Sequence, residues 1–198
     1  GTLLDTNWAH VEAWQRAFAA GGYRVARDRI ELEIGKGGDK LVPAILGEEA
    51  DRRHGDAMRK RQPKDFERLA KRGLAPLPKA MKLLDAVRAA NLKVALATSS
   101  KRTHLQILGR ASGIDLEGAA DCLTTADDAE QSKPAPDIVS AAVHKLGLSP
   151  AQCAMVGDTQ YDIQAAKHAG VIGLGLLTGY QSKATLMRCG ARAVWKDV

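Results

Sequence analysis

Residues 153–162 read Cys-Ala-Met-Val-Gly-Asp-Thr-Gln-Tyr-Asp, and the fold class of the chain follows from this stretch. The four residues 153–156 are apolar and predict a short buried strand. Gly157 then leads to two carboxylates, Asp158 and Asp162, and the pattern of residues 162–169 predicts a helix. A strand that passes through a polar turn directly into a helix is the repeating unit of parallel α/β proteins.

The same alternation extends over the sequence from Pro76 onward. Apolar runs predict buried strands at residues 92–97, 120–123 and 171–176, and a last strand at 191–195. Amphipathic patterns predict helices at 79–90 and 135–146, with Pro134 suited to the first turn of the second helix. Asn91 and Gly147 are residue types that end helices. We therefore predict an α/β fold, with a Rossmann-like parallel sheet and helices on both of its faces.

The N-terminal third of the chain has a different pattern. Apolar residues recur at helical spacing from Trp8 to Phe18, and Gly21-Gly22 ends that helix. Further polar-faced helices follow, and no strand is predicted among them. We predict that residues 8–75 form an all-helical domain, inserted into an α/β core that consists of residues 1–7 and 76–198.

The composition is that of a soluble globular protein, because apolar residues make up 45% and charged residues 26% of the chain. No apolar run approaches the ~20 residues that span a bilayer. The first residues lack the basic-then-apolar pattern of a secretory signal, although the sequence starts at Gly1 rather than Met. The three cysteines are widely spaced, which favours free thiols in a reducing compartment. No pattern indicates a dimer, and we expect a cytoplasmic monomer that contacts no membrane.

The net charge of +6 is concentrated in one segment. Residues 52–72 hold nine Lys or Arg and three Asp or Glu, so the remainder of the chain sums to zero. Such a stripe could bind nucleic acid, but the segment has a single aromatic residue, Phe66, and no nucleic-acid motif. We favour a solvated helix face and expect no nucleic-acid partner. A positive lip that attracts a phosphorylated substrate is the alternative.

Polar residues follow three of the predicted strands, at the edge where open parallel sheets bind ligands. Thr98-Ser99-Ser100 follow the first strand, Ser132-Lys133-Pro134 lie beyond the second, and Asp158 and Asp162 follow the third. Hydroxyl and ammonium groups bind phosphate, and carboxylate oxygens bind Mg²⁺. Together these residues predict one site for a phosphate and a magnesium ion.

Each of these groups has a structural alternative. Thr98 and its neighbours could cap a helix, Lys133 could be an exposed loop residue, and Asp158 could cap the helix that carries Asp162. Any one of them alone would be structural more often than functional. Their occurrence in this order, each group after its own strand, favours the functional interpretation.

These segments together resemble the motifs of the haloacid dehalogenase-like hydrolase superfamily. Residues 1–6 resemble the tail of its first motif, Asp-x-Asp-Gly-Thr-Leu-x-Asp. Thr98 matches the second motif, Lys133 the third, and Gly157-Asp158 through Asp162 the fourth, Gly-Asp-x-x-x-Asp. The resemblance extends to about Gly179 and points to the branch of phosphoglycolate phosphatases and β-phosphoglucomutases. In that branch a helical cap is inserted after the first motif.

The resemblance implies a role for each matched residue. Thr98 would bind a phosphate oxygen, with help from the backbone N–H of Ser99, and Lys133 would neutralise the phosphoryl group. Asp158 would bind Mg²⁺ directly, and Asp162 would contribute to the metal site by orienting the water ligands of the ion.

The resemblance also implies two aspartates, a nucleophile three residues before Gly1 and a general acid and base immediately before it. Neither lies within these 198 residues. In the family this segment is a central strand, whose loss would cost roughly 5–15 kcal/mol, comparable to the whole stability of a domain. We therefore expect the source protein to carry that strand upstream of Gly1.

In such enzymes the cap selects the substrate. His10 lies on the first predicted cap helix, and Gly35-Lys36-Gly37-Gly38-Asp39-Lys40 resembles the specificity loop. We expect His10, Lys36 and Lys40 to bind the substrate, because lysines attract an anion and glycines let the backbone approach it. The alternative is a flexible turn between two helices.

Three functions fit these observations. The first, which we predict, is a Mg²⁺-dependent phosphatase that acts on a small phosphorylated metabolite, such as phosphoglycolate or a sugar phosphate, through an aspartyl-phosphate intermediate. The second is a sugar-phosphate mutase of the β-phosphoglucomutase type, since His10 and Trp14 resemble residues of those enzymes. The third is a non-catalytic scaffold with a basic binding surface. A dehalogenase is disfavoured, because that chemistry needs no metal.

Overall fold

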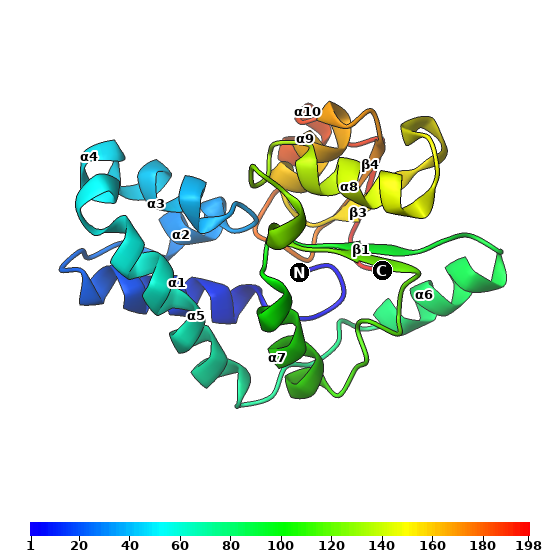
Figure 1. The fold of residues 1–198 in the computed structure, drawn as a ribbon. Helices are drawn as coiled ribbons and strands as arrows, with labels where there is room; N and C mark the ends of the chain where they lie inside the picture. Colours follow the sequence, from blue (N-terminus) through cyan, green and yellow to red (C-terminus); the bar gives the residue numbers. More distant parts are fainter.

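Five short strands form two parallel sheets in the C-terminal two thirds of the chain (Figure 1). The structure is a computed structural model that describes all residues from Gly1 to Val198. In the first sheet β1 (Ala95–Ala97) pairs with β2 (Cys122–Thr124). In the second sheet β4 (Ile172–Leu176) lies between β3 (Ala154–Gly157) and β5 (Ala193–Trp195). The predicted α/β fold with parallel pairing is confirmed.

The strand predicted at residues 92–97 is wrong in its first half. Leu92 is 61% exposed, and β1 begins only at Ala95. The parallel pairing stops there because the Asp121 side chain takes the place of the next backbone hydrogen-bond partner. Its carboxylate accepts a hydrogen bond of 2.7 Å from the N–H of Val94, and its own N–H donates to the Val94 carbonyl at 2.8 Å. The other four strands begin and end within two residues of the predicted positions.

Four helices cover the two faces of the sheets. Helices α8 (Asp137–Leu146) and α9 (Gln160–His168) lie on one face, and α6 (Ala80–Ala89) and α7 (Arg102–Ser112) lie on the other (Figure 1). Helix α10 (Lys183–Arg188) packs on β4 and β5. Helix α8 packs on β1 and β2, and α9 packs on β3 and β4. The two helices share one apolar cluster, against which Ala97 of β1 and Met155 of β3 both pack.

The helix ends follow local sequence signals. Asn91 (φ 56°) and Gly147 (φ 66°) both adopt left-handed conformations after α6 and α8, so the predicted termination is confirmed. Helix α8 begins at Asp137, two residues later than predicted, because Pro136 disfavours helical geometry in the residue before it. Helix α7 was absent from the predicted elements; only Leu105 and Leu108 form its buried apolar stripe.

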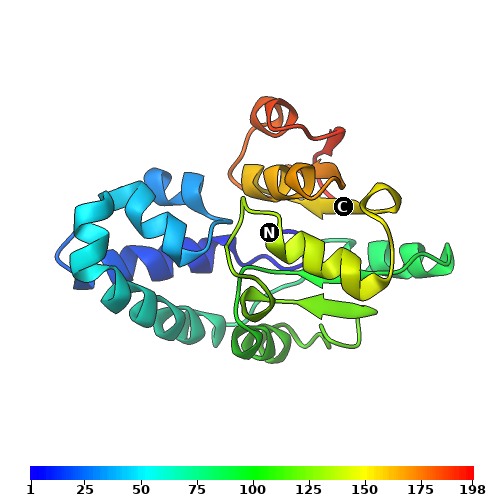
Figure 2. The same ribbon diagram turned by 45° about the horizontal axis from the view of Figure 1, so that its top comes forward.

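The helical pattern predicted for residues 8–75 is observed as a group of helices beside the sheets (Figures 1 and 2). The elements are α1 (Asn7–Ala20), α2 (Arg27–Glu33), α3 (Gly38–Leu46), α4 (Glu48–Ala50), a π-helical turn (Asp51–Gly55) and α5 (Asp56–Ala70). Phe18, Ile30 and Leu41 are fully buried in the core of this group. None of the helices in the molecule has both the length and the apolar character needed to cross a bilayer.

The basic segment at residues 52–72 corresponds to α5 and the turn before it. Its buried carboxylate, Asp65, is 1% exposed and accepts hydrogen bonds from Arg61 at 2.5 Å and Arg68 at 3.3 Å. Eight of its nine cations are solvent-exposed: Arg52, Arg53, Lys60, Arg61, Lys64, Arg68, Lys71 and Arg72. Two of the arginines therefore also stabilise a buried charge inside the helical group.

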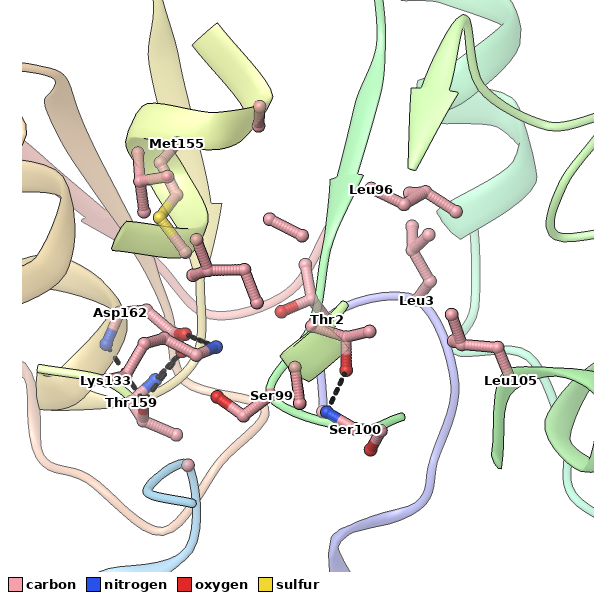
Figure 3. A pocket seen from close by; sticks show the side chains of 18 of the residues that line it. Thr2, Leu3, Leu96, Ser99, Ser100, Leu105, Lys133, Met155, Thr159 and Asp162 are labelled. Carbon is pink, nitrogen blue, oxygen red and sulfur yellow. Dashed lines mark hydrogen bonds and ion pairs between the residues drawn. The ribbon is translucent and has the colours of Figure 1, made fainter. Parts of the chain in front are cut away.

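A cavity of about 1330 Å³ separates the two sheets. Strands β1 and β3 are not hydrogen-bonded to each other, and Leu96 and Met155 line the cavity from opposite sides (Figure 3). The cavity continues to the carboxyl ends of both strands, where its lining becomes polar. Gly1 lies at this end, held by a hydrogen bond of 2.6 Å from Thr178 Oγ1 to its carbonyl.

Candidate active site

Lys133 and Asp162 form a buried ion pair at the polar end of the cavity (Figure 3). Lys133 Nζ lies 2.6 Å from Asp162 Oδ1, and less than a tenth of either side chain is exposed. Burial opposes ionisation of Asp162, but the Lys133 ammonium and hydrogen bonds from Thr159 hold its pKa below the usual value. Lys133 is therefore not an exposed loop residue. The structure brings it from the loop after β2 to the helix that follows β3.

Thr159 fixes the second oxygen of Asp162. Both the N–H and the hydroxyl of Thr159 donate to Asp162 Oδ2, at 3.1 and 2.7 Å. In return the Thr159 hydroxyl accepts from the N–H of Asp162, which completes a capping box at the start of α9. This box explains why α9 begins at Gln160 and not at Asp162. Asp162 Oδ1 accepts from Lys133 and Oδ2 accepts from Thr159, so in this arrangement Asp162 positions Lys133.

Asp158 is a buried carboxylate without a cationic partner. It is 6% exposed and accepts hydrogen bonds from Thr2 Oγ1 at 2.9 Å and Asn7 Nδ2 at 3.0 Å. No Lys, Arg, His or terminal ammonium lies within ion-pair distance of it. The helix that follows is capped by Thr159, so the alternative that Asp158 is its cap is wrong. A buried charge with only neutral donors fits a site that takes a cation.

The loop after β1 presents an unpartnered hydroxyl to the same cavity. Ser99 Oγ is buried and has no hydrogen-bond partner, whereas Thr98 Oγ1 accepts from the N–H of Ser100 at 3.1 Å. Helix α7 has Lys101 at its N-cap without a side-chain cap, so the capping alternative for this loop is wrong. An unpartnered buried hydroxyl costs roughly 1–3 kcal/mol, a cost that a bound oxyanion would remove. Thr98, Ser99, Lys133, Asp158 and Asp162 all line the cavity.

The loop at residues 35–40 of the helical group lies against this site. Gly35 has φ +108°, and a Cβ atom there would lie 2.6 Å from Thr159 Oγ1, so only glycine fits. Lys36 lines the cavity but is paired with Glu33 at 2.5 Å and lies over the Tyr161 ring. Lys40 does not line the cavity, because its ammonium donates to the Ser132 carbonyl at 2.5 Å. The loop at residues 35–40 therefore packs against the α/β core and is not an exposed turn.

Three core side chains hold this loop in place. The Tyr161 hydroxyl lies 3.0 Å from the Leu32 carbonyl and 2.9 Å from Glu33 Oε2. Gln181 donates to the same Leu32 carbonyl at 3.2 Å, and the Ser132 hydroxyl donates to Asp39 at 2.9 Å. Tyr161 and Gln181 were not predicted to be functional. Tyr161 lies between Asp158 and Asp162, and no local pattern marks it as a contact to residues 128 or 129 positions away.

His10, on α1, also lines the cavity. Its ring stacks on Phe66 with centroids 4.3 Å apart, and its Nδ1 lies 3.4 Å from Gln62 Nε2. Burial lowers the pKa of His10 to about 3, with the neighbouring His104 contributing, so the imidazole is neutral at pH 7. His104 and Gln62 also line the cavity, and neither was predicted to do so.

The family model for haloacid dehalogenase-like hydrolases matches residues 1–170. This match covers all the loops that meet at the cavity. The chain belongs to the haloacid dehalogenase-like hydrolase family. The predicted resemblance is thereby confirmed.

Relatives within the haloacid dehalogenase-like hydrolases include phosphatases. The chain is 25% identical over 197 residues to the phosphorylated carbohydrates phosphatase of Thermotoga maritima, a match that covers 99% of this chain and 90% of the relative. It is 29% identical over 179 residues to the CbbY protein of Rhodobacter capsulatus, covering 86% and 79% of the two chains. A solved hydrolase structure from Pseudomonas syringae superposes with a TM-score of 0.92 at 31% identity, covering 100% of this chain and 90% of the other.

Phosphatases of this family are thus the enzymes that this chain is similar to, and the chain is an enzyme of that kind. Its polar cavity end combines an ammonium, an unpartnered hydroxyl and a buried carboxylate that lacks a counter-charge. This donor set matches a phosphoryl group on one side and a hard divalent cation on the other.

Proposed function

We propose that the chain is a Mg²⁺-dependent phosphatase that hydrolyses the monoester of a small phosphorylated carbohydrate. The observation that carries the proposal is the meeting of Ser99 Oγ and Lys133 Nζ with the uncompensated carboxylate of Asp158 in one cavity. The relative from Thermotoga maritima, which the chain matches over nearly its full length, is named for phosphorylated carbohydrates. That name supports carbohydrate phosphates over phosphoglycolate as the substrate class.

Asp158 is the residue that would hold the metal ion. When bound, Mg²⁺ would withdraw charge from the phosphoryl oxygens. The two neutral donors, Thr2 and Asn7, orient the Asp158 carboxylate at the mouth of the cavity. Asp162 contributes indirectly by keeping Lys133 in place.

Lys133, Thr98 and Ser99 would bind the phosphoryl group. Lys133 places a positive charge that is only 6% exposed beside the group, where a low dielectric strengthens its attraction for the oxygens. The Ser99 hydroxyl, which has no protein partner, would donate to one phosphate oxygen. The Thr98 hydroxyl, which accepts from the N–H of Ser100, would donate its own hydrogen to another phosphate oxygen.

The nucleophile would be an aspartate that precedes Gly1. Gly1 lies directly beside Asp158, since a Cβ atom on it would lie within 2 Å of Asp158 Oδ2. Residues attached before Gly1 would therefore start inside the cavity. A carboxylate oxygen would attack phosphorus while the ester P–O bond breaks, and a second aspartate would protonate the departing alcohol. Water would then cleave the aspartyl phosphate to release orthophosphate and free the carboxylate.

The test is orthophosphate release by the chain preceded by an Asp-x-Asp segment, assayed on a panel of sugar phosphates and on phosphoglycolate. We expect turnover that requires Mg²⁺ and that is lost when Asn replaces the first aspartate. Turnover that persists without Mg²⁺, or with that Asn, would contradict the proposal.

Ser99→Ala supplies the matched control for the phosphate site. We expect about tenfold weaker orthophosphate binding, the loss of one hydrogen bond to a charged group. The unfolding free energy should not fall, because the removed hydroxyl has no partner in the folded chain. A clear loss of stability with unchanged phosphate binding would show that Ser99 is structural.

A sugar-phosphate mutase is the second candidate, favoured by the fact that His10 and Trp14 both line the cavity. The same assay separates the two activities when a hexose 1-phosphate is the substrate. A mutase converts it into an isomeric sugar phosphate, whereas a phosphatase releases free orthophosphate.

A further inference from the structure

Ser132, the residue directly before Lys133, is bound by the loop at residues 35–40 through both its hydroxyl and its carbonyl. The hydroxyl donates to Asp39 Oδ2 at 2.9 Å, and the carbonyl accepts from Lys40 Nζ at 2.5 Å. These partners lie 93 and 92 positions away in the chain. Unlike Lys36, which pairs with Glu33, Lys40 forms no ion pair. Two adjacent residues of the helical group therefore hold one residue of the α/β core.

The backbone of the loop also lies directly against Ser132. Gly37 is buried, and a Cβ atom on it would lie 2.5 Å from Ser132 Cβ and 2.8 Å from Ser132 Oγ. The serine side chain is not free to move aside, because its hydroxyl is bonded to Asp39. Glycine at position 37 thus lets the loop come close enough for Asp39 and Lys40 to reach Ser132.

The other hydrogen bonds of residues 131–135 stay within the core. The N–H of Gln131 donates to Asp137 Oδ2 at 2.9 Å, and the N–H of Ala135 donates to the Ser132 carbonyl at 3.2 Å. The Ser132 carbonyl thus accepts one bond from its own turn and one from Lys40. Among these bonds, those of Ser132 are the ones that reach the helical group, and they do so next to Lys133.

Lys133 has little freedom to compensate for a shift of Ser132. Its side chain is 8% exposed, and its Nζ lies 2.6 Å from Asp162 Oδ1. Asp162 is itself fixed by the two hydrogen bonds from Thr159. A fixed charge stabilises a transition state only where negative charge develops, and a misplacement of about 1 Å can cost roughly 10²-fold in rate. A displaced Ser132 backbone would move the root of the Lys133 side chain away from that position.

We propose that Asp39 and Lys40 are positioning residues, which hold Lys133 against the phosphoryl group by binding Ser132. The inference rests on the proposed function and gives Lys40 a role other than the substrate contact that its charge predicts. Lys133 is in place when the loop at residues 35–40 lies on Ser132. Docking of the loop and completion of the phosphate site are therefore one event.

The test measures kcat and KM of the chain preceded by a first strand that ends in Asp-x-Asp. The substrate is p-nitrophenyl phosphate, whose leaving group carries no sugar hydroxyls, so a lost sugar contact cannot explain a change. We expect Lys40→Met and Asp39→Ala each to lower kcat about tenfold, the effect of one hydrogen bond to a charged group. KM should change less than about twofold, because the loop does not contact this substrate.

Matched variants distinguish positioning from a general loss of structure. Lys40→Arg keeps a donor and Asp39→Asn keeps an acceptor for Ser132, so both should retain most of the wild-type kcat. Asp39→Ala combined with Ser132→Ala should lose no more than either change alone, because both remove the same hydrogen bond. Lys82→Met makes the same change as Lys40→Met at an exposed position of α6 and should leave kcat unchanged.

Amide hydrogen exchange reports on the segment itself and does not depend on turnover. Lys40→Met and Asp39→Ala should speed exchange in residues 131–135 relative to Lys82→Met, because the segment loses one of its anchors. Thermal unfolding reports whether each variant folds.

The outcomes separate the two proposals. If wild type turns over neither p-nitrophenyl phosphate nor any sugar phosphate of the panel, the phosphatase fails and this inference falls with it. If wild type is active but Lys40→Met raises KM at unchanged kcat, Lys40 is a substrate contact, and the phosphatase stands while the positioning role is overturned. A lower kcat with unchanged exchange in residues 131–135 also overturns that role. If the Lys40 or Asp39 variants do not fold, Ser132→Ala, which removes a single hydroxyl, decides through the same two readouts.

Discussion

Lys133 and Asp162 show how one residue pair can serve both stability and the site. Theirs is the one ion pair in the chain with both side chains less than a tenth exposed. Removing one partner of a buried pair leaves the other charge without compensation, which typically costs about 3–5 kcal/mol. We expect Asp162→Asn to lower the free energy of unfolding by about 3 kcal/mol in urea titrations at pH 7. Asp85→Asn, at an exposed position that forms no ion pair, should change the free energy of unfolding by less than about 0.5 kcal/mol.

The difference in unfolding free energy between wild type and Asp162→Asn should shrink as the pH falls. The folded-state pKa of Asp162 is lowered, so its stabilising contribution is complete above the unfolded-state carboxyl pKa of about 4. The contribution is lost as the pH falls toward the lower folded-state value. Wild type and Asp162→Asn should therefore converge in stability on acidification. A difference that grows as the pH falls would contradict the assignment of a lowered pKa.

At the scale of elements, Tyr161 joins α9 to the end of α2, directly before the loop at residues 35–40. Tyr161 lies in the first turn of α9, yet its hydroxyl bonds to Leu32 and Glu33 at the end of α2. Tyr161→Phe removes both bonds and keeps the ring under Lys36. We expect a loss of about 1 kcal/mol in local stability and faster hydrogen exchange in residues 32–40.

Tyr23→Phe is the matched control for this element-level contact. The Tyr23 hydroxyl forms no hydrogen bond to the protein, although its ring packs edge-on against His54. Exchange in residues 32–40 should be unchanged in this variant. If the two variants gave the same exchange rates, Tyr161 would not be what holds the loop.

At the scale of the whole molecule, α8 links the two sheets through the apolar cluster that it shares with α9, since α8 packs on β1 and β2 and α9 packs on β3 and β4. Ile138 is 2% exposed and belongs to the apolar cluster that includes Ala97 of β1 and Met155 of β3. Because the two sheets share no hydrogen bonds, this packing is a main link between them. We expect Ile138→Ala to cost about 2–5 kcal/mol in urea denaturation, the usual range for a large-to-small change in a core.

Ile138→Ala should also make the urea unfolding transition less cooperative. If α8 links the sheets as described, the variant should unfold in one less cooperative step or in two steps seen by different probes. Val25→Ala, a change of similar chemistry at a half-exposed position of the helical group, should preserve a single transition. Unaltered stability of Ile138→Ala would rule out this role for α8.

Sequence patterns predicted the α/β class, the parallel pairing and the approximate position of every strand, because short apolar runs and their flanking turns are local signals. The same holds for the residues of the family motifs, since Thr98, Lys133, Asp158 and Asp162 each follow a strand end. Local signals failed at β1, where the side chain of Asp121 replaces a rung of the ladder. Lys40 was predicted to contact the substrate from its charge and loop position, and the structure places its ammonium on the Ser132 carbonyl, outside the cavity lining.

The sequence by itself determined the kind of fold and the family, since both depend on residue order and spacing along the chain. Only the tertiary structure decided which side chains face one cavity and which of them lack a partner. No sequence pattern marks the side chains of His104 and Ser99 as unpartnered. They lack hydrogen-bond partners only because distant segments of the folded chain bury them. The physical reason is that burial and hydrogen-bond satisfaction depend on neighbours far apart in the chain, which no local pattern encodes.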